Sequence, residues 1–305
     1  MENAGKISFR TIKHKRKISK DELVIKAFIY LFLVLFAVIT IFPVISMLLY
    51  SLNDPFDVYR NGVSLFPRKW SLRNYGDLFE NYVGFSRGAF ISTVRTVIGT
   101  LTALVSNALL SFILSRKKFL FKSSLSLFWV ITLYAQGGIV PTYILYRFLN
   151  LRESFWVYIV PCLVSAMYVL VMRTYMKNIP DSLEEAAQLE GAGYLRIFWS
   201  IISPVCKPVY AVTALFIASY HWNSFIDTLL YNRMEPRYTT LQFELMKYFS
   251  ELRIGTTTNV TYCRTPTPYT VKAAATVLTM LPFLILYPFL QKYFIDGLSF
   301  SGVKD

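Results

Sequence analysis

The sequence predicts an all-α, polytopic membrane protein with six transmembrane helices, and three observations carry that prediction. Of its 305 residues, 54% are hydrophobic and 16% are charged, whereas soluble domains carry about 25% charged residues. Six uncharged runs are at least 19 residues long, close to the roughly 20 residues that a helix needs to cross a bilayer. Lysine and arginine also gather beside particular runs. The runs are residues 27–52, 96–115, 123–146, 154–172, 208–226 and 273–291.

Each run is predicted to be helical, because lipid cannot satisfy the polar groups of an open backbone. The predicted spans follow the runs, with the second extended at its start. Long polar connectors over 53–94 and 227–272 are expected on the outer side, with tight turns at 116–122 and 147–153 and a long inner connector at 173–207. The spans are therefore expected at about 27–52, 89–115, 123–146, 154–172, 208–226 and 273–291.

Charge sets the predicted orientation. Residues 1–20 hold seven lysines and arginines against one acid, and 116–122 holds four with no acid. The positive-inside rule places both segments in the cytoplasm, and six spans return the C-terminus to the same side. We expect a basic cytoplasmic tail over 1–26 and one transmembrane domain over 27–305. The charge of +14 is accounted for by this topology and by contact with membrane lipid, with no need of nucleic acid.

A cleaved signal peptide is the competing interpretation of the N-terminus. The first uncharged run has 26 residues, against about 7–15 for the apolar part of a signal peptide. No A-x-A site follows it. We therefore expect a membrane span.

Several polar side chains occur in or beside the runs. Polar residues in lipid usually face the interior of a helix bundle, where they either join helices or line a translocation path; the sequence leaves both roles open. Arg95 opens the second run and could also snorkel toward the membrane surface. The candidates for the path are Arg95, Asn107, Gln136, Tyr220, His221, Trp222 and Asn223.

Catalytic chemistry has little support. The six runs contain no Asp or Glu, which weakens an ion-driven secondary carrier and an enzyme using paired carboxylates. There is no G-x-x-x-x-G-K-[ST] phosphate loop, so any ATPase must be another chain. Two histidines and three widely spaced cysteines provide no metal site. We expect no enzyme activity, cofactor or metal on this chain.

Residues 180–192 of the inner connector predict a short helix. Asp181 or Ser182 can cap its start, with Glu184 or Glu185 completing a capping box, and Gly191 suits the position just after its end. A helix this short is marginal alone. It either packs on its own bundle or docks into a groove of a separate cytoplasmic protein. The predicted docking face, spaced at i, i+3, i+4 and i+7, comprises Leu183, Ala186, Ala187 and Glu190.

This connector resembles the EAA loop of bacterial ABC importer permeases. Glu185, Ala186 and Ala187 supply the E-A-A, Gly191 follows after three residues, and 201–204 match I-x-L-P apart from Ser203 in place of leucine. Glu190 stands where aspartate is common. Segments 137–143 and 291–304 resemble the third span and the tail of carbohydrate permeases of the maltose type, in the smaller-permease branch. Closer still are permeases that import oligosaccharides of the aldouronate type and alginate.

The resemblance implies a permease subunit that forms half of a translocation pore for an oligosaccharide. Its partners would be a second homologous permease, two ATPase subunits that hold ATP and Mg²⁺, and an extracytoplasmic solute-binding protein, all at the bacterial cytoplasmic membrane. A coupling loop over 177–208 would contact the ATPase. Its coupling residues would be Glu184, Glu185, Ala186, Ala187, Leu189, Gly191 and Ala192.

The resemblance also frames the substrate and the rival functions. Arg95 could favour an acidic, uronate-containing sugar. The aromatic and polar cluster from Tyr220 to Asn223 could line the pore, although aromatic residues also form belts at membrane interfaces. The alternatives from other classes are an ion-coupled secondary carrier or channel and a polytopic membrane enzyme.

Overall fold

The computed structural model describes residues 20–61, 66–81, 83–117, 119–135, 137–255 and 268–299. Within these ranges the regular secondary structure is helical, apart from an isolated antiparallel bridge between Asn53 and Trp70. The predicted all-α class is therefore confirmed. Most of the basic tail lies outside the described residues, and residues 20–26 form the start of the first helix.

The long helices account for the first, second and last predicted spans. α1 and α4 are long and apolar enough to cross a membrane, and α14 contains a shorter apolar stretch, Tyr269–Ile285. The bounds of these helices are α1 Lys20–Ser51, α4 Val83–Ser115 and α14 Pro268–Ser299.

Three further candidate spans are pairs of helical segments with a bend between them. Counting each pair as one span, up to five long crossings exist among the described residues, beside the shorter stretch in α14. The segments are α5 Lys122–Tyr134 with α6 Ile139–Phe148, the 3₁₀ turns η1 Phe155–Tyr158 and η2 Val160–Cys162 with α7 Ala166–Lys177, and α9 Tyr194–Ile197, the π-turn η3 Phe198–Ile202 and α10 Ser203–Val205 with α11 Lys207–Asn223.

The prediction of one continuous helix over 123–146 and over 154–172 is therefore wrong. The first breaks before α6, where Gly138 adopts φ +81°, a conformation open mainly to glycine. The second breaks between η2 and α7, where Asn107 of α4 substitutes for the missing helical bonds. Its amide Nδ2 donates to the Leu163 carbonyl at 3.1 Å, and its Oδ1 accepts from the Ser165 N–H at 2.9 Å. Such replacement bonds allow a broken helix at membrane depth.

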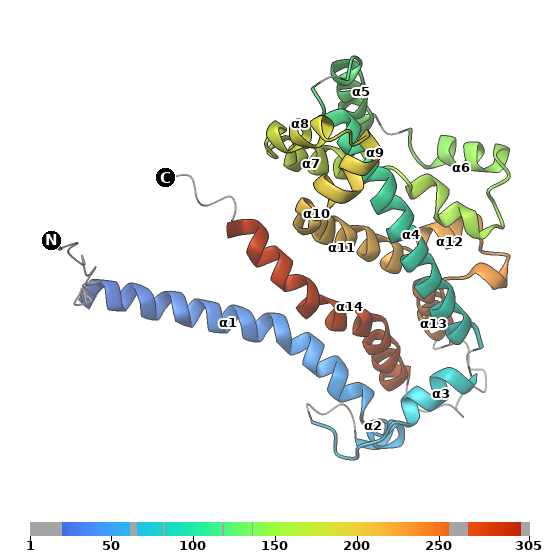
Figure 1. Cartoon of the computed structure of the whole chain (residues 1–305). Coiled ribbons are helices and arrows are strands. Elements are labelled where there is room, and N and C mark those ends of the chain that lie inside the picture. The colour runs from blue at the N-terminus through green and yellow to red at the C-terminus, as the bar shows by residue number, and fades with distance from the viewer. Residues whose placement is uncertain are drawn as a thin grey trace.

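The remaining helices lie in or beside the three long connectors between the predicted spans. α2, α3, α12, η4 and α13 gather away from α8, and Figure 1 shows α2 and α3 at one end of the molecule with α5, α7 and α8 at the other. Their bounds are α2 Pro55–Asn61, α3 Arg73–Asn81, α8 Asp181–Leu189, α12 Ile226–Tyr231, η4 Pro236–Tyr238 and α13 Leu241–Gly255.

α4 is the central helix of the fold and packs against α7, α11 and α13. Close approach to α11 depends on Gly99, because a Cβ added there would lie 2.4 Å from Nε2 of His221. α1 instead runs beside α14 (Figure 1), and none of its most apolar 18-residue window is buried. The bundle around α4 thus forms the protein's own core, while α1 presents its apolar side chains outward.

Candidate functional site

The start of α8 differs from the predicted capping box. The helix begins at Asp181, and the capping position is held by Pro180, without a capping bond from a side chain. Asp181 instead pairs with Lys117, and Glu184 pairs with Arg116. These ion pairs join α8 to the two residues that directly follow α4. The capping prediction is therefore wrong for the N-terminus.

The end of α8 agrees with the prediction. Gly191 follows the C-cap residue and adopts φ +80°. The Gly191 N–H donates to the Gln188 carbonyl at 3.0 Å, and the Ala192 N–H donates to the Ala187 carbonyl at 2.9 Å. These two bonds form a Schellman motif, which stops the helix and turns the chain toward α9.

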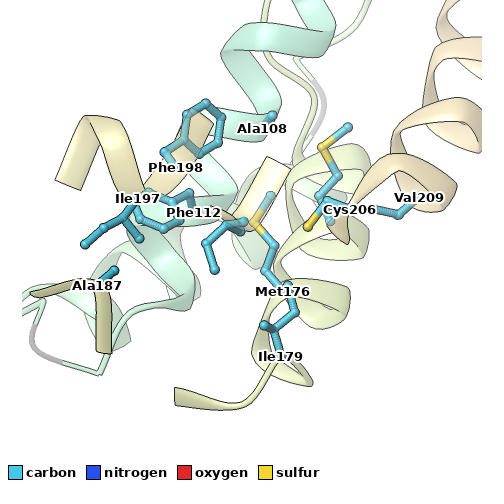
Figure 2. Close-up of a cluster of buried hydrophobic side chains, with 11 residues drawn as sticks. Ala108, Phe112, Met176, Ile179, Ala187, Ile197, Phe198, Cys206 and Val209 are labelled. Carbon is cyan, nitrogen blue, oxygen red and sulfur yellow. The ribbon is translucent and has the colours of Figure 1, made fainter. Parts of the chain in front are cut away.

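The inner face of α8 packs on the protein's own bundle. Ala187 is 6% exposed and belongs to the α8-end core, a cluster of side chains from α4, α7, α8 and the segment that leads into α11 (Figure 2). Of the two roles left open for this face of the helix, Ala187 takes the first, packing on its own bundle. The core comprises Ala108, Phe112, Met172, Met176, Ile179, Ala187, Ile197, Phe198, Ile202, Cys206 and Val209.

A half-sheltered ion pair ties α8 to α4. The side chains of Arg116 and Glu184 are 10% and 12% exposed. Arg116 also donates to the Met176 carbonyl at 3.4 Å and lies over the Phe112 ring, 4.9 Å from its centre. Glu184 accepts a second bond from Gln188 at 3.0 Å. Glu184, a predicted coupling residue, therefore holds α8 in place from within the protein.

The Lys117–Asp181 pair is a solvent-exposed supplement. Its mutual hydrogen bond and charge raise the pKa of Lys117 and lower the pKa of Asp181. Such surface pairs contribute little to stability. They still reinforce the position of the first turn of α8.

The outer face of α8 carries the residues left free for another molecule. Leu189 is 91% exposed and Leu183 43% exposed, and Glu185, Ala186 and Glu190 are exposed beside them. We call these five residues the α8 outer face. Burial of an apolar side chain as exposed as Leu189 under a partner would stabilise the complex, because its surface leaves water.

Arg95 lies inside the protein. It is 0% exposed and pairs with Asp227. It also donates to the Ser224 carbonyl and to Nδ1 of His221, each at 3.4 Å, and stands over the ring of Tyr158 at 4.4 Å from its centre. The suggestion that Arg95 snorkels is wrong, because its charge is neutralised within the bundle.

Sequence reasoning missed the carboxylate partner, Asp227, because this residue follows the uncharged run 208–226 and was counted with the outer connector. α11 ends at Asn223 and α12 begins at Ile226, so the chain turns back and carries Asp227 to Arg95. The signal that could have found the pair is in the sequence: Asp227 directly follows one uncharged run, and Arg95 directly precedes another.

The residues around this pair form a polar centre, defined as Arg95, Tyr158, His221, Asp227 and Thr228. The Tyr158 hydroxyl donates to the Tyr238 carbonyl at 2.7 Å and lies 3.0 Å from the Thr228 hydroxyl. The polar centre connects α4, η1, α11 and α12. Its members bond one another, so it joins helices, which is the first of the two roles left open above.

Residues 220–223 at the end of α11 differ in exposure, with two side chains buried and two exposed. His221 is fully buried, and Trp222 is 7% exposed and donates to the Thr279 carbonyl at 2.9 Å. Tyr220 is 50% exposed, and Asn223 is exposed and accepts from Gln242 at 3.3 Å. Tyr220 and Asn223 therefore remain available to a solute or a second subunit. Asn107 is buried at the helix break, and Gln136 lies outside the described residues.

A shallow hollow lies at the α3 end, between the start of α4 and η4. Arg87 donates to the Pro236 carbonyl at 3.5 Å across it. Its lining residues are Arg87, Phe90, Ile91, Glu235, Pro236 and Arg237.

Comparison with known proteins identifies relatives that span nearly the whole chain. The polygalacturonan/rhamnogalacturonan transport system permease protein YtcP of Bacillus subtilis is 30% identical over 278 residues, covering 90% of this chain and 96% of YtcP. Protein LplC of the same organism is 29% identical, covering 87% of this chain and 90% of LplC. No family model matches the sequence.

A solved structure shares the fold. It is a bacterial ABC transporter involved in the import of the acidic polysaccharide alginate, and one of its chains aligns with a TM-score of 0.81 at 24% identity. The alignment covers 90% of this chain and 98% of that chain.

Proposed function

The chain belongs to the family of carbohydrate ABC transporter permeases, and from this premise we propose that α8 couples its translocation pore to a cytoplasmic ATPase. The protein is a sugar-importer permease subunit of the bacterial cytoplasmic membrane. Its family implies an ATPase and a binding protein as partners. The observation that carries the coupling proposal is a short helix held by its inner face, with the α8 outer face uncovered.

The proposed assembly has six spans in this chain, with both termini in the cytoplasm and the basic tail over 1–26 ahead of the transmembrane domain over 27–305. A second homologous permease completes the pore. Two ATPases, which hold ATP and Mg²⁺, each receive one coupling helix, and a solute-binding protein delivers the sugar from outside. The charge of segments 1–20 and 116–122 supports this orientation.

Coupling requires that force on α8 reach the membrane helices. Arg116–Glu184 and Lys117–Asp181 attach α8 to the end of α4, and Ala187 packs it against α7 and the segment before α11. A displaced α8 would therefore move these elements together, as packed cores shift between discrete arrangements. We assign ATPase contact to Glu185, Ala186 and Leu189, with Gly191 and Ala192 forming the stop that fixes their register.

The pore is assigned to exposed residues of α11. Phe216 and Tyr220 are 55% and 50% exposed, and Asn223 is exposed one turn further on. Aromatic faces with an amide beside them can stack on a sugar ring and bond its hydroxyls. Gln136 stays a candidate for the same path, and the buried Arg95 and His221 act by holding the helices that frame it.

The proposed substrate is an acidic, uronate-containing oligosaccharide. YtcP is named for polygalacturonan and rhamnogalacturonan transport. Support from this chain comes from the hollow at the α3 end, whose lining includes Arg87, Arg237 and the exposed ring of Phe90. Arg237 also pairs with Glu235 there, at 3.7 Å, so Arg87 is the arginine assigned to the sugar carboxylate. Guanidinium groups favour carboxylates through paired hydrogen bonds.

The coupling proposal is tested in the assembled transporter with Glu185→Lys and Leu189→Asp, which change the α8 outer face. We expect normal membrane insertion and loss of sugar-stimulated ATP hydrolysis. Glu80→Lys on α3 makes the same charge change at an exposed position of the opposite end and should retain coupling. Cysteines placed at 185 and 189 should crosslink to the ATPase. Full coupling in both variants, without crosslinks, would contradict the proposal.

A further inference from the structure

Three basic side chains converge beside α8 at the junction of α5 and α7. Lys122 is the first residue of α5, and Arg173 and Lys177 lie in the last two turns of α7, which packs against α5. The positive charges of Arg173 and Lys122 both act on Lys177, and α5 packs against α7. The three cations therefore lie near one another and repel.

The cluster keeps a surplus of positive charge, because Asp181, the acid whose charge acts on Lys122, already pairs with Lys117. The neighbouring acids are engaged elsewhere, because Glu184 pairs with Arg116 and Asp181 with Lys117. The recorded bond of Arg173 runs from Nε to the Leu114 carbonyl at 3.2 Å, which leaves its charge uncompensated. Like charges held together lower the stability of a fold unless an anion joins them.

An apolar tip adjoins the cations. Leu120 is 92% exposed and Phe121 is 66% exposed, and both directly precede Lys122. At the membrane surface, apolar side chains contact acyl chains and basic side chains contact headgroups. Two exposed apolar side chains beside a basic cluster therefore suit this boundary. Basic side chains there attract anionic lipid.

We propose that Lys122, Arg173 and Lys177 bind the headgroup phosphate of an anionic phospholipid, whose acyl chains contact Leu120 and Phe121. The α8 end faces the cytoplasm in the proposed orientation, so the lipid belongs to the inner leaflet. The site is separate from the α8 outer face, because its cations come from α5 and α7. It would neutralise the end of α7, four residues before Asp181 begins α8.

The test uses the assembled transporter in phosphatidylcholine nanodiscs with a minor fraction of spin-labelled phosphatidylglycerol. The immobilised fraction of this label, compared with spin-labelled phosphatidylcholine, measures headgroup selectivity. Lys122→Gln with Lys177→Gln leaves the Arg173–Leu114 bond in place. We expect each substitution to lower the selectivity about three- to fivefold, and Lys122→Arg with Lys177→Arg to retain it.

The matched control removes two exposed charges at the α3 end, with Arg60→Gln and Lys69→Gln, and should keep the selectivity. Equal loss in this control would overturn the site, as would unchanged selectivity in the Lys122/Lys177 variant. Displacement of the labelled lipid by inorganic phosphate would reassign the cluster to a soluble anion. Loss of the ATPase from that variant in pure phosphatidylcholine would reassign it to a protein contact.

Discussion

Two largely buried arginine–carboxylate pairs join α4 and the residue after it to the rest of the bundle, and they serve different purposes. Arg95–Asp227 lies in the polar centre, where Arg95 is completely shielded and Asp227 is 18% exposed. Tyr158, His221 and Thr228 each make a bond there, although Nε2 of His221 has no hydrogen-bond partner among the described residues. Arg116–Glu184 lies at the α8 end, on the same helix as the α8 outer face, where Leu189 is uncovered. The first pair stabilises a closed interior, whereas the second positions a surface that another protein can use.

The largest expected effect is the loss of Arg95. Arg95→Leu leaves Asp227 without its partner in the interior, and breaking a buried pair this way costs about 3–5 kcal/mol. We expect a large drop in the melting temperature of the purified transporter. Adding Asp227→Leu should recover much of that drop, since the unpaired charge is gone. A small effect of Arg95→Leu alone would show that the polar centre is not closed.

A smaller stability effect, with a larger effect on coupling, is expected at the α8 end. Arg116→Leu should cost about 2–3 kcal/mol, less than Arg95→Leu, because the Arg116 side chain is 10% exposed whereas that of Arg95 is fully shielded. Transport and ATP hydrolysis should nevertheless become uncoupled, since α8 loses its attachment to α4. Measuring both activities and the melting temperature separates the two pairs. Equal profiles for Arg95→Leu and Arg116→Leu would remove the distinction drawn above.

The close packing of Gly99 against His221 allows a steric test of the polar centre. Gly99→Ala places a methyl group 2.4 Å from Nε2 of His221 if nothing moves, so α4 and α11 must shift. Overpacking of this kind costs about 1–3 kcal/mol. Ser106→Ala, on a half-buried position of the same helix, is the control. The melting temperature should fall for the glycine variant and stay close to wild type for the control.

Gly191→Ala tests the C-terminal stop of α8 without adding a clash, because the space around a new Cβ is open. The left-handed backbone costs about 1–2 kcal/mol for a residue with a side chain. Since the strain is local to α8, we expect weaker sugar-stimulated ATP hydrolysis with little change in the melting temperature. Gly191→Asn tolerates this conformation better and should be milder. A variant with normal coupling would show that the register of α8 does not depend on this turn.

The smallest effect is expected from the exposed Lys117–Asp181 pair. Folding lowers the pKa of Asp181, so this carboxylate stabilises the fold at pH values above its pKa in the unfolded chain. That stabilisation is lost as the pH falls through its pKa in the folded protein. Folding raises the pKa of Lys117, so its stabilisation is present below the pKa in the unfolded chain and is lost as the pH rises through the pKa in the folded protein. Coupling should therefore differ little between wild type and Lys117→Gln near neutral pH, and less still at high salt. A strong effect there would give the surface pair a role that the structure assigns to Arg116–Glu184.

Much of the fold was predictable because it follows from composition over long stretches. Uncharged runs indicated the candidate spans, and the sequence around Glu185, Ala186, Ala187 and Gly191 predicted the short helix α8 and its stop. The breaks within the third and fourth candidate spans were not predictable, because an uncharged run has the same composition whether or not its helix is interrupted. The interruption in the fourth depends on Asn107, which comes from a different helix.

The sequence by itself therefore determined an apolar helical chain, the basic segments that predict its orientation, and a short helix ended by Gly191, because these depend on local hydrophobicity, charge and backbone preference. The tertiary structure decided which polar groups meet. It turned Asp227 inward to Arg95, used Glu184 and Ala187 to hold α8, and left Glu185 and Leu189 outside. The two ion pairs join residues more than sixty positions apart in the chain, so the local sequence does not show that these residues meet.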